Sequence, residues 1–287
     1  MSFRTSGLPD LTRVPDLLRA LAALLVTAMA ISACGTAAPT PAPRSRQHKP
    51  PAAHTSAPKA SSCQSTFVPA YFYSSTIWAQ ATDTRPAPAV MMLNVDSGPG
   101  TGPLSHFQTL VTQAQDAGIT VLGYVSTSYG QSAVSTVETQ VQEYKSWYGV
   151  TGIFLDLTQG TPGEFSYYRT LANFIRSNIP NGVIWLNPGD YPAPEFMSIA
   201  NVVMVFEGPY SAYRSDQVPS WISQYSPSQF AHVIYDTSAS DLASAVSLSR
   251  ERRAGHLFVT DLNLPGNPYD ALPSYWSREA GAVTAPC

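Results

Sequence analysis

The sequence predicts a (β/α)₈ barrel of the TIM type, an α/β fold in a single domain. Eight short stretches rich in β-branched and aromatic residues recur along the chain, and longer amphipathic or polar segments separate them. Each short stretch is nearly continuous in apolar residues, which is typical of parallel strands covered on both faces. Eight strands with eight connections favour a closed barrel. The alternative, an open doubly wound sheet, would need edge strands and usually has fewer strands at this length.

The expected elements follow in chain order. Strands are expected at 67–73, 89–95, 119–125, 151–156, 183–187, 201–206, 231–236 and 256–260. Helices are expected at 103–117, 132–148, 163–178 and 239–254, with shorter ones near 76–82, 193–199, 217–224 and 272–281. Because the active site of such a barrel lies at the carboxyl ends of its strands, the residues that end each strand are the candidates to inspect.

The N-terminal segment, residues 1–33, has the pattern of an export signal. Three arginines precede an uncharged apolar run at 20–33, which is shorter than the roughly 20 residues that span a bilayer. The run ends on Ile-Ser-Ala-Cys, which resembles a bacterial lipobox and predicts lipid attachment at Cys34. We therefore expect a lipoprotein exported to, and anchored on, the outer face of the bacterial cytoplasmic membrane. An ordinary secretory signal with an incidental cysteine is the alternative.

Residues 34–62 are rich in Ala, Pro, Ser and Thr, with too little apolar surface to offset the entropy of ordering, so we expect a disordered tether there. The remaining segment, 63–287, is the expected barrel domain. It holds nine Lys or Arg against 17 Asp or Glu, a net charge near −8. Nucleic acid is an improbable ligand for such a domain, because phosphate binding depends on a basic surface.

Two cysteines bracket the expected barrel. Cys63 is its first residue, and Cys287 is the last residue of the chain. An oxidising exterior favours a disulfide between them, which would oppose fraying of the two ends. Two free thiols are the alternative.

Polar and aromatic residues gather where the expected strands end. Aromatic faces can cover a pyranose ring while amides and carboxylates bind its hydroxyls, so the pattern favours a neutral or cationic carbohydrate ligand. Ordinary packing is the alternative for any single tyrosine. The expected substrate-binding residues are Tyr71, Tyr73, Asn94, Asp96, Tyr124, Tyr129, Asn187, Tyr235 and Asp261.

Two carboxylates are the candidate catalytic residues. Asp156 ends the fourth expected strand and Glu207 follows the sixth, which would bring both to one barrel mouth. Glycoside hydrolysis needs such a pair, one acid to protonate the leaving oxygen and one carboxylate to attack or to activate water. Helix capping or loop hydrogen bonding is the alternative. Asp96, Asp190 and Asp261 are weaker candidates, because their surroundings also suit turns.

No other catalytic class has support in the sequence. The five histidines show no HExxH or paired ligand spacing, so no metal site is expected. The chain contains no GxGxxG, P-loop or GxSxG motif, and no cofactor is expected. No pattern in the sequence sets an oligomeric state.

Four motifs carry a resemblance to a known family: "SGPG" (97–100), "YVSTSYG" (124–130), "SWYGVTGIFLD" (146–156) and "NPYDALPSYW" (267–276). In this order they resemble the spherulin-4 family over residues 67 to about 276. Members of the family include glycoside hydrolases that act on polysaccharides containing N-acetylgalactosamine. The resemblance implies a (β/α)₈ barrel with acidic catalytic residues at the ends of strands four and six.

The chain departs from the family pattern beside the first of these acids. Where the family shows Phe-Asp-Glu, this chain has Leu155, Asp156 and Leu157; after strand eight, Leu262 replaces the second acid of a Thr-Asp-Asp pattern. Glu207 matches the family's strand-six glutamate. The leading hypothesis is a glycoside hydrolase that cuts within an amino-sugar polysaccharide. The rivals are a catalytically inactive carbohydrate-binding lipoprotein and an envelope scaffold without a sugar ligand.

Overall fold

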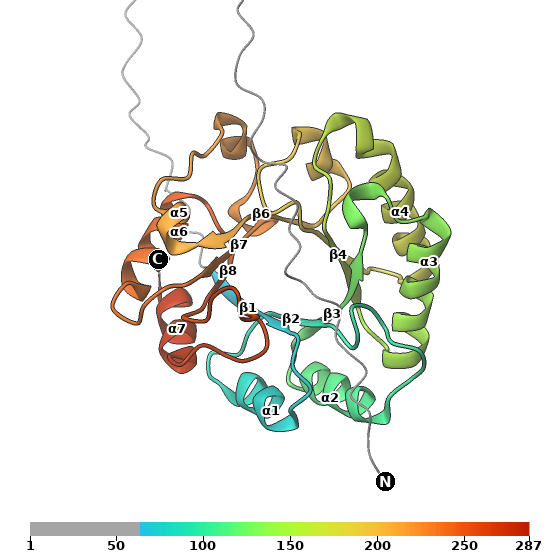
Figure 1. The fold of residues 1–287 in the computed structure, drawn as a ribbon, viewed down its shortest axis with the longest axis horizontal. Helices are drawn as coiled ribbons and strands as arrows, with labels where there is room; N and C mark the ends of the chain where they lie inside the picture. The colour runs from blue at the N-terminus through green and yellow to red at the C-terminus, as the bar shows by residue number, and fades with distance from the viewer. Residues whose placement is uncertain (1–63, 287) are drawn as a thin grey trace, which may run out of the picture. The chain divides into compact units, whose positions relative to one another are not determined.

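A computed structural model describes residues 64–286 and confirms the predicted fold. Eight parallel strands pair in chain order and close into a barrel, with the helices around its outside (Figure 1). The strands are β1 (Ser65–Ala70), β2 (Val90–Leu93), β3 (Thr120–Ser126), β4 (Gly152–Asp156), β5 (Val183–Leu186), β6 (Val202–Pro209), β7 (Phe230–Tyr235) and β8 (His256–Val259). The first strand ends earlier than expected, because Tyr71 and the residues after it leave the sheet, and β6 extends three residues further.

The connections carry the expected helices. They are α1 (Ser75–Asp83), α2 (Ser105–Asp116), α3 (Val134–Glu143), α4 (Phe165–Asn178), α5 (Tyr210–Tyr213), α6 (Leu242–Glu251) and α7 (Trp276–Val283). The segment expected as one helix at 132–148 divides into α3 and a π-helical turn, Tyr144–Tyr148. Short 3₁₀ turns replace the helices expected near 193–199 and 217–224. The sequence pattern does not predict the single turn α5.

The centre of the barrel is filled by aromatic side chains. Phe67 of β1 packs edge-on against Trp185 of β5, with ring centroids 5.2 Å apart, and Phe258 of β8 lies 6.2 Å from Phe67. All three are buried. Burying each such side chain stabilises the fold by about 1.5–3 kcal/mol. Side chains therefore fill the middle of the barrel, and a site can form only at the carboxyl ends of the strands.

A β-bulge interrupts β6. Met204 pairs with Ala231 of β7, and Phe206 pairs with the next residue, His232, so Val205 is an extra residue in the ladder. Side chains alternate between the two faces of a regular strand, and positions 204 and 207 would then face opposite ways. The extra residue restores the parity. As a result Phe206 packs outward against Tyr213, whereas Met204 and Glu207 both face the barrel interior.

The two ends of the barrel domain meet at one arginine. Gln64, just before β1, accepts a hydrogen bond from Arg250 Nε at 3.2 Å, and Arg250 Nη2 donates to the carbonyl oxygens of Ala282 and Val283. Gln64 also donates to Ser249 and to a backbone carbonyl of the same region. These contacts hold the start of β1 beside the end of α7.

Several predictions concern residues outside the described range. The signal peptide at 1–33, the lipidation site Cys34, the tether at 34–62 and the pair Cys63 and Cys287 all lie outside residues 64–286, and they stay predictions. Within the described part of the chain, no helix is long and apolar enough to cross a membrane.

We expect a disulfide between Cys63 and Cys287. Cys63 adjoins Gln64, and Cys287 follows Val283 by four residues, a span of at most about 14 Å, while both neighbours contact Arg250. Thiol labelling of the exported protein should therefore require prior reduction. Full labelling without reductant would exclude the bond.

Candidate active site

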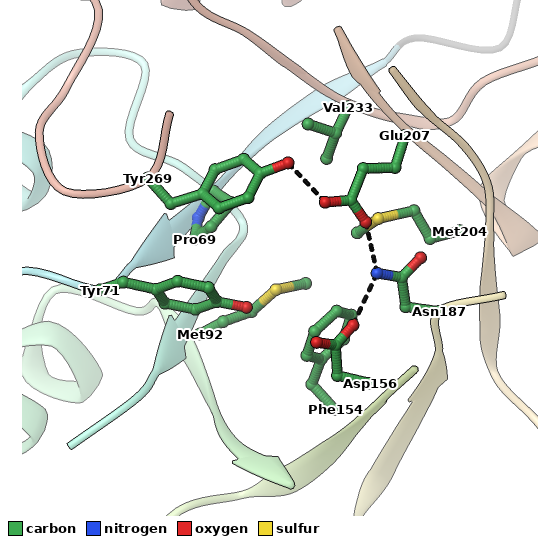
Figure 2. Close-up of a pocket in the computed structure, with 10 residues that line it drawn as sticks. All are labelled: Pro69, Tyr71, Met92, Phe154, Asp156, Asn187, Met204, Glu207, Val233 and Tyr269. Atoms are coloured by element: carbon green, nitrogen blue, oxygen red, sulfur yellow. Dashed lines mark hydrogen bonds between the residues drawn. The ribbon is translucent and has the colours of Figure 1, made fainter. Parts of the chain in front are cut away.

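A cavity opens into the barrel at the carboxyl ends of the strands (Figure 2). Its volume is about 40 Å³, well below the roughly 300–1,000 Å³ of typical ligand pockets, so only part of a sugar ring could enter it. Seven of the eight strands or the loops after them contribute to its wall. The lining residues are Pro69, Tyr71, Met92, Phe154, Asp156, Asn187, Met204, Glu207, Val233 and Tyr269.

Asn187 joins the two predicted catalytic carboxylates. Its Nδ2 donates to Asp156 Oδ1 at 2.7 Å and to Glu207 Oε2 at 2.5 Å. The two carboxylate oxygens are therefore at most about 5.2 Å apart, and about 4.5 Å if the two N–H bonds diverge by about 120°. Gly189 N donates to Asn187 Oδ1 at 2.9 Å, which requires the amide nitrogen to face the acids.

The strands explain why this pair forms. Asp156 follows Phe154 by two positions on β4, and Asn187, directly after β5, follows Trp185 by two positions, so all four side chains face inward. The strand that Asn187 follows lies between β4 and β6. The backbones of β4 and β6 are about 10 Å apart across it. The carboxyl groups close this gap by leaning toward the shared amide.

Burial raises the pKa of the Asp156 carboxyl. Three hydrogen bonds act in the opposite direction and favour the ionised form, from the Tyr124 hydroxyl, the Asn187 amide and the backbone N–H of Leu157. Three hydrogen bonds from protein groups therefore stabilise the ionised form of Asp156.

Burial also raises the pKa of the Glu207 carboxyl, and the negative charge of Asp156 raises it further. Two hydrogen bonds act against this shift, one from Asn187 and one from the Tyr269 hydroxyl to Glu207 Oε1 at 2.5 Å. Asp156 has three such donors against two for Glu207, and the charge of the other acid is a cause of the shift for Glu207 alone, so the surroundings favour Glu207 as the protonated member of the pair.

No positive charge offsets these acids along the cavity wall. The lining residues include no Lys, Arg or His, and within residues 64–286 no group of three His, Cys, Asp or Glu side chains could hold a metal ion. The acids are therefore held by hydrogen bonds from neutral donors.

The side chain of Asn187 is engaged by neighbouring protein groups. The sequence predicts that it binds substrate, but both amide hydrogens are engaged by the carboxylates and the carbonyl oxygen by Gly189. Asn187 has no free donor for a sugar hydroxyl. Its position makes it the spacer of the acid pair.

Three tyrosines form an arc along the opposite wall. Tyr71 packs edge-on against Tyr124, with ring centroids 5.4 Å apart, and against Tyr269, at 5.6 Å. Figure 2 shows the Tyr71 hydroxyl pointing into the cavity and the Tyr269 hydroxyl pointing at Glu207. The arc runs from the partner of Asp156 to the partner of Glu207, so it closes the cavity on the side away from Asn187.

Tyr129 stands at the rim beside the acids. Partial burial raises the pKa of its phenol, and the charges of Asp156 and Glu207 raise it further, although its side chain is 53% exposed. It lies in a run of three positive φ angles, Ser128 to Gly130 (48°, 57° and 83°). Such strained conformations cluster at functional sites. Here Tyr129 N donates to the Leu157 carbonyl oxygen at 2.7 Å.

Leu157 and Tyr235 complete the rim. Leu157 also has a positive φ of 49° and is 36% exposed. The pKa of Tyr235 is raised by burial and by the charge of Glu207. Both residues are therefore close to the acids without lining the cavity.

Four predicted substrate-binding residues are not brought to the cavity. Tyr73 is 63% exposed and stacks on His106, with ring centroids 4.2 Å apart. Asn94 accepts a hydrogen bond from Gly98 N within its own turn, and Asp96 is an exposed residue of the same turn. Asp261 accepts hydrogen bonds from the backbone N–H and hydroxyl of Ser274. The turn chemistry of their surroundings accounts for Asn94, Asp96 and Asp261.

Tyr269 is the site residue that the sequence did not reveal. It belongs to the quoted motif at 267–276 but sits in an irregular loop after β8, far from any strand end. No periodic pattern marks such a position. The proline and tyrosine residues of the motif at 267–276 are the signal in the sequence that points to this loop.

Comparisons with known proteins agree with this architecture. The sequence model of a family described as "Spherulation-specific family 4" matches residues 65–283. Spherulin-4 of Physarum polycephalum is 32% identical over 233 residues, which cover 76% of this chain and 69% of that protein.

Two solved structures share the fold. The crystal structure of Aspergillus clavatus Sph3 in complex with GalNAc has a TM-score of 0.69 at 23% identity, and covers 78% of this chain and 98% of that one. A chitinase from Chromobacterium violaceum has a TM-score of 0.54 at 10% identity, and the match covers 78% of this chain and 100% of the chitinase chain. The fold is thus like that of glycoside hydrolases.

Proposed function

Because the chain belongs to the spherulin-4 family, we propose that it is a glycoside hydrolase that cuts within an amino-sugar polysaccharide of the N-acetylgalactosamine type. The spacing of Asp156 and Glu207 carries the proposal. The Sph3 structure with GalNAc supports the choice of sugar. The two acids that line one cavity at the carboxyl ends of the strands support the reaction class.

The carboxyl separation favours a double displacement. Retaining glycosidases hold their two carboxyl groups about 5 to 5.5 Å apart, whereas inverting enzymes need about 6.5–9.5 Å to admit a water molecule. One amide bridges Asp156 and Glu207, so their nearest oxygens lie within about 5.2 Å.

The roles follow from the order of protonation. Glu207 donates its proton to the glycosidic oxygen as the bond from that oxygen to C1 breaks, and Asp156 forms a bond to C1. Glu207, now a carboxylate, then takes a proton from water, whose oxygen attacks C1 and releases Asp156. Each cycle consumes one water, returns both acids to their initial states and retains the anomeric configuration.

We expect the protein to release reducing ends from poly-N-acetylgalactosamine or galactosaminogalactan, with the first product in the anomeric configuration of the substrate. Reducing-end assays and proton NMR of the product in the first minutes measure the two properties. An inverted product would contradict the assignment of Asp156 as the nucleophile. Absence of both cleavage and calorimetric binding for all amino-sugar polymers would contradict the carbohydrate function.

A carbohydrate-binding protein without turnover is the second candidate, and Leu157 favours it. The family resemblance implies a glutamate at this position, and a leucine side chain cannot exchange protons. Leu157 is partly exposed at the rim and its backbone N–H supports Asp156. Under this alternative the same cavity binds the sugar and Asp156 and Glu207 only accept hydrogen bonds.

Leu157→Glu separates the two candidates. If the missing acid is what limits the site, the variant should gain at least about tenfold in reducing-end release, with little change in affinity for the same polymer. Leu157→Gln is the matched control, because it has the same size without the ionisable group. Equal rates for the wild type and for both variants would mean that this position does not limit turnover.

We further propose that the protein acts outside the cytoplasm, anchored by lipid at Cys34. The lipobox-like sequence and the proline-rich segment after it support this location. A polymer substrate is consistent with it, since large polysaccharides occur outside the membrane.

A further inference from the structure

We propose that Tyr269 is a positioning residue that holds the acid–base oxygen Oε1 of Glu207 and adjusts how readily it binds a proton, and that the loop after β8 is tied closed to keep Tyr269 there. The inference rests on the proposed hydrolytic function for its role in turnover. Its effect on Glu207 is a property of the free protein and can be measured without substrate.

The two hydrogen-bond partners of Glu207 differ in kind. Asn187 Nδ2 donates to Oε2 and cannot accept, because an amide nitrogen has no available lone pair. Tyr269 donates to Oε1 at 2.5 Å, and a hydroxyl can also reverse and accept. Tyr269 can therefore either donate to Oε1 or accept the proton that Oε1 carries, whereas Asn187 can only donate to Oε2. The geometry assigns the transferable proton to Oε1.

The loop that carries Tyr269 is closed at its base. Asp261, directly after Thr260, accepts hydrogen bonds from the backbone N–H of Ser274, at 3.0 Å, and from its hydroxyl. Residues 262–273 thus form a loop whose two ends are joined by the Asp261 side chain. Inside it, Asn267 Oδ1 accepts from Tyr269 N at 2.9 Å. Asp261 acts on the site through this loop, although it does not line the cavity.

Tyr269 also has a fixed ring. It packs edge-on against Tyr71, so its hydroxyl cannot swing away from Glu207 without breaking the tyrosine arc. The groups whose charge or polarity acts on Glu207 come from every element around it: Asp156 on β4, Asn187 after β5, Tyr71 after β1, Tyr124 on β3, Tyr129 after β3, Tyr235 on β7 and Tyr269. Of these groups Asp156 carries a charge, and none is basic.

The test is a titration of Glu207 in the full chain. The chain has seven glutamates, and labelling their carboxyl carbons with ¹³C gives resolved NMR signals, of which the one lost in Glu207→Gln is that of Glu207. In Tyr269→Phe we expect the midpoint for Glu207 to rise by about 1 to 2 pH units, because a charge-assisted donor to the carboxylate is lost. Asp261→Ala should raise it by a smaller amount, and Asp261→Asn, which keeps an acceptor for Ser274, should restore the wild-type value.

Tyr235→Phe is the control for the titration, since Tyr235 is close to Glu207 and no hydrogen bond joins the two. A wild-type titration of Glu207 in Tyr269→Phe, or an equal shift in Tyr235→Phe, would overturn the inference. If the wild type cleaves polysaccharide, the alkaline limb of its pH profile should move upward with the NMR midpoint in Tyr269→Phe, and a limb that stays in place would overturn the role in turnover. If it cleaves nothing, the hydrolytic proposal fails while the titration still decides the role of Tyr269. Thermal melting of each variant verifies that it is folded.

Discussion

Glu207→Gln is expected to lower turnover by at least about 100-fold while leaving the affinity for substrate within about threefold. The amide can still accept from Asn187 and can donate to Tyr269, whose hydroxyl reverses, so the shape of the cavity is kept. What is lost is the proton that the leaving oxygen needs. Asp156→Asn removes the nucleophile and is expected to have a loss at least as large.

The losses of turnover in Glu207→Gln and Asp156→Asn should not add in the double variant. Because the proposed mechanism uses both acids in one reaction, the double variant should be about as slow as the slower single variant. Initial rates of reducing-end release and calorimetric binding, measured side by side, test this. Cleavage that survives both amide substitutions would show that the reaction runs elsewhere.

Glu207→Gln should also stabilise the folded protein. Burial raises the pKa of Glu207 in the folded state, so the folded protein binds a proton more readily than the unfolded chain. This contribution to the free energy of unfolding is present below the usual glutamate pKa of about 4.3 and is lost as the pH rises through the folded pKa. Glu207→Gln should therefore raise the melting temperature at pH 7 by a few degrees, about 2–4 °C per kcal/mol, and by less at pH 4.

Gly152→Ala is expected to have the largest effect on stability. A Cβ at Gly152, the first residue of β4, would lie 2.2 Å from the carbonyl oxygen and 2.9 Å from the nitrogen of Val183 on β5. Both atoms belong to the backbone and cannot move without separating the strands that carry Asp156 and Asn187. We expect a loss of about 3 kcal/mol or more in the free energy of unfolding.

Gly163→Ala is the matched control, because a Cβ there meets no atom within 4 Å. Denaturant unfolding of the two variants gives the comparison. A Gly152→Ala protein as stable as the Gly163→Ala protein would mean that β4 and β5 do not approach each other as described.

The strands, and the inward direction of Asp156 and Asn187 in the site, follow from the alternation of inward and outward side chains along a strand. Eight apolar stretches predicted eight strands, and counting by two from Phe154 or Trp185 gives the inward direction of Asp156 and Asn187. The pattern does not set the ends of the strands, because Tyr71 to Tyr73 are as apolar as a strand but leave the sheet. Local pattern cannot show where pairing with a neighbour stops.

The rest of the site depends on contacts that no periodicity reports. Glu207 was found as an acid near the end of β6, but counting by two from Met204 would turn it toward the helices, and only the extra residue Val205 reverses this. Tyr269 reaches the cavity through an irregular loop. Asp261 and Asn94 were expected at the cavity because they follow strands, yet nearby N–H groups within hydrogen-bond reach take their oxygens instead.

The bulge at Val205 also has an evolutionary consequence. It divides β6 into two halves, each of which takes its facing from its own partners on β7. A relative without the bulge should therefore carry the glutamate one position nearer to the residue that matches Met204, because only then does its side chain face the barrel interior.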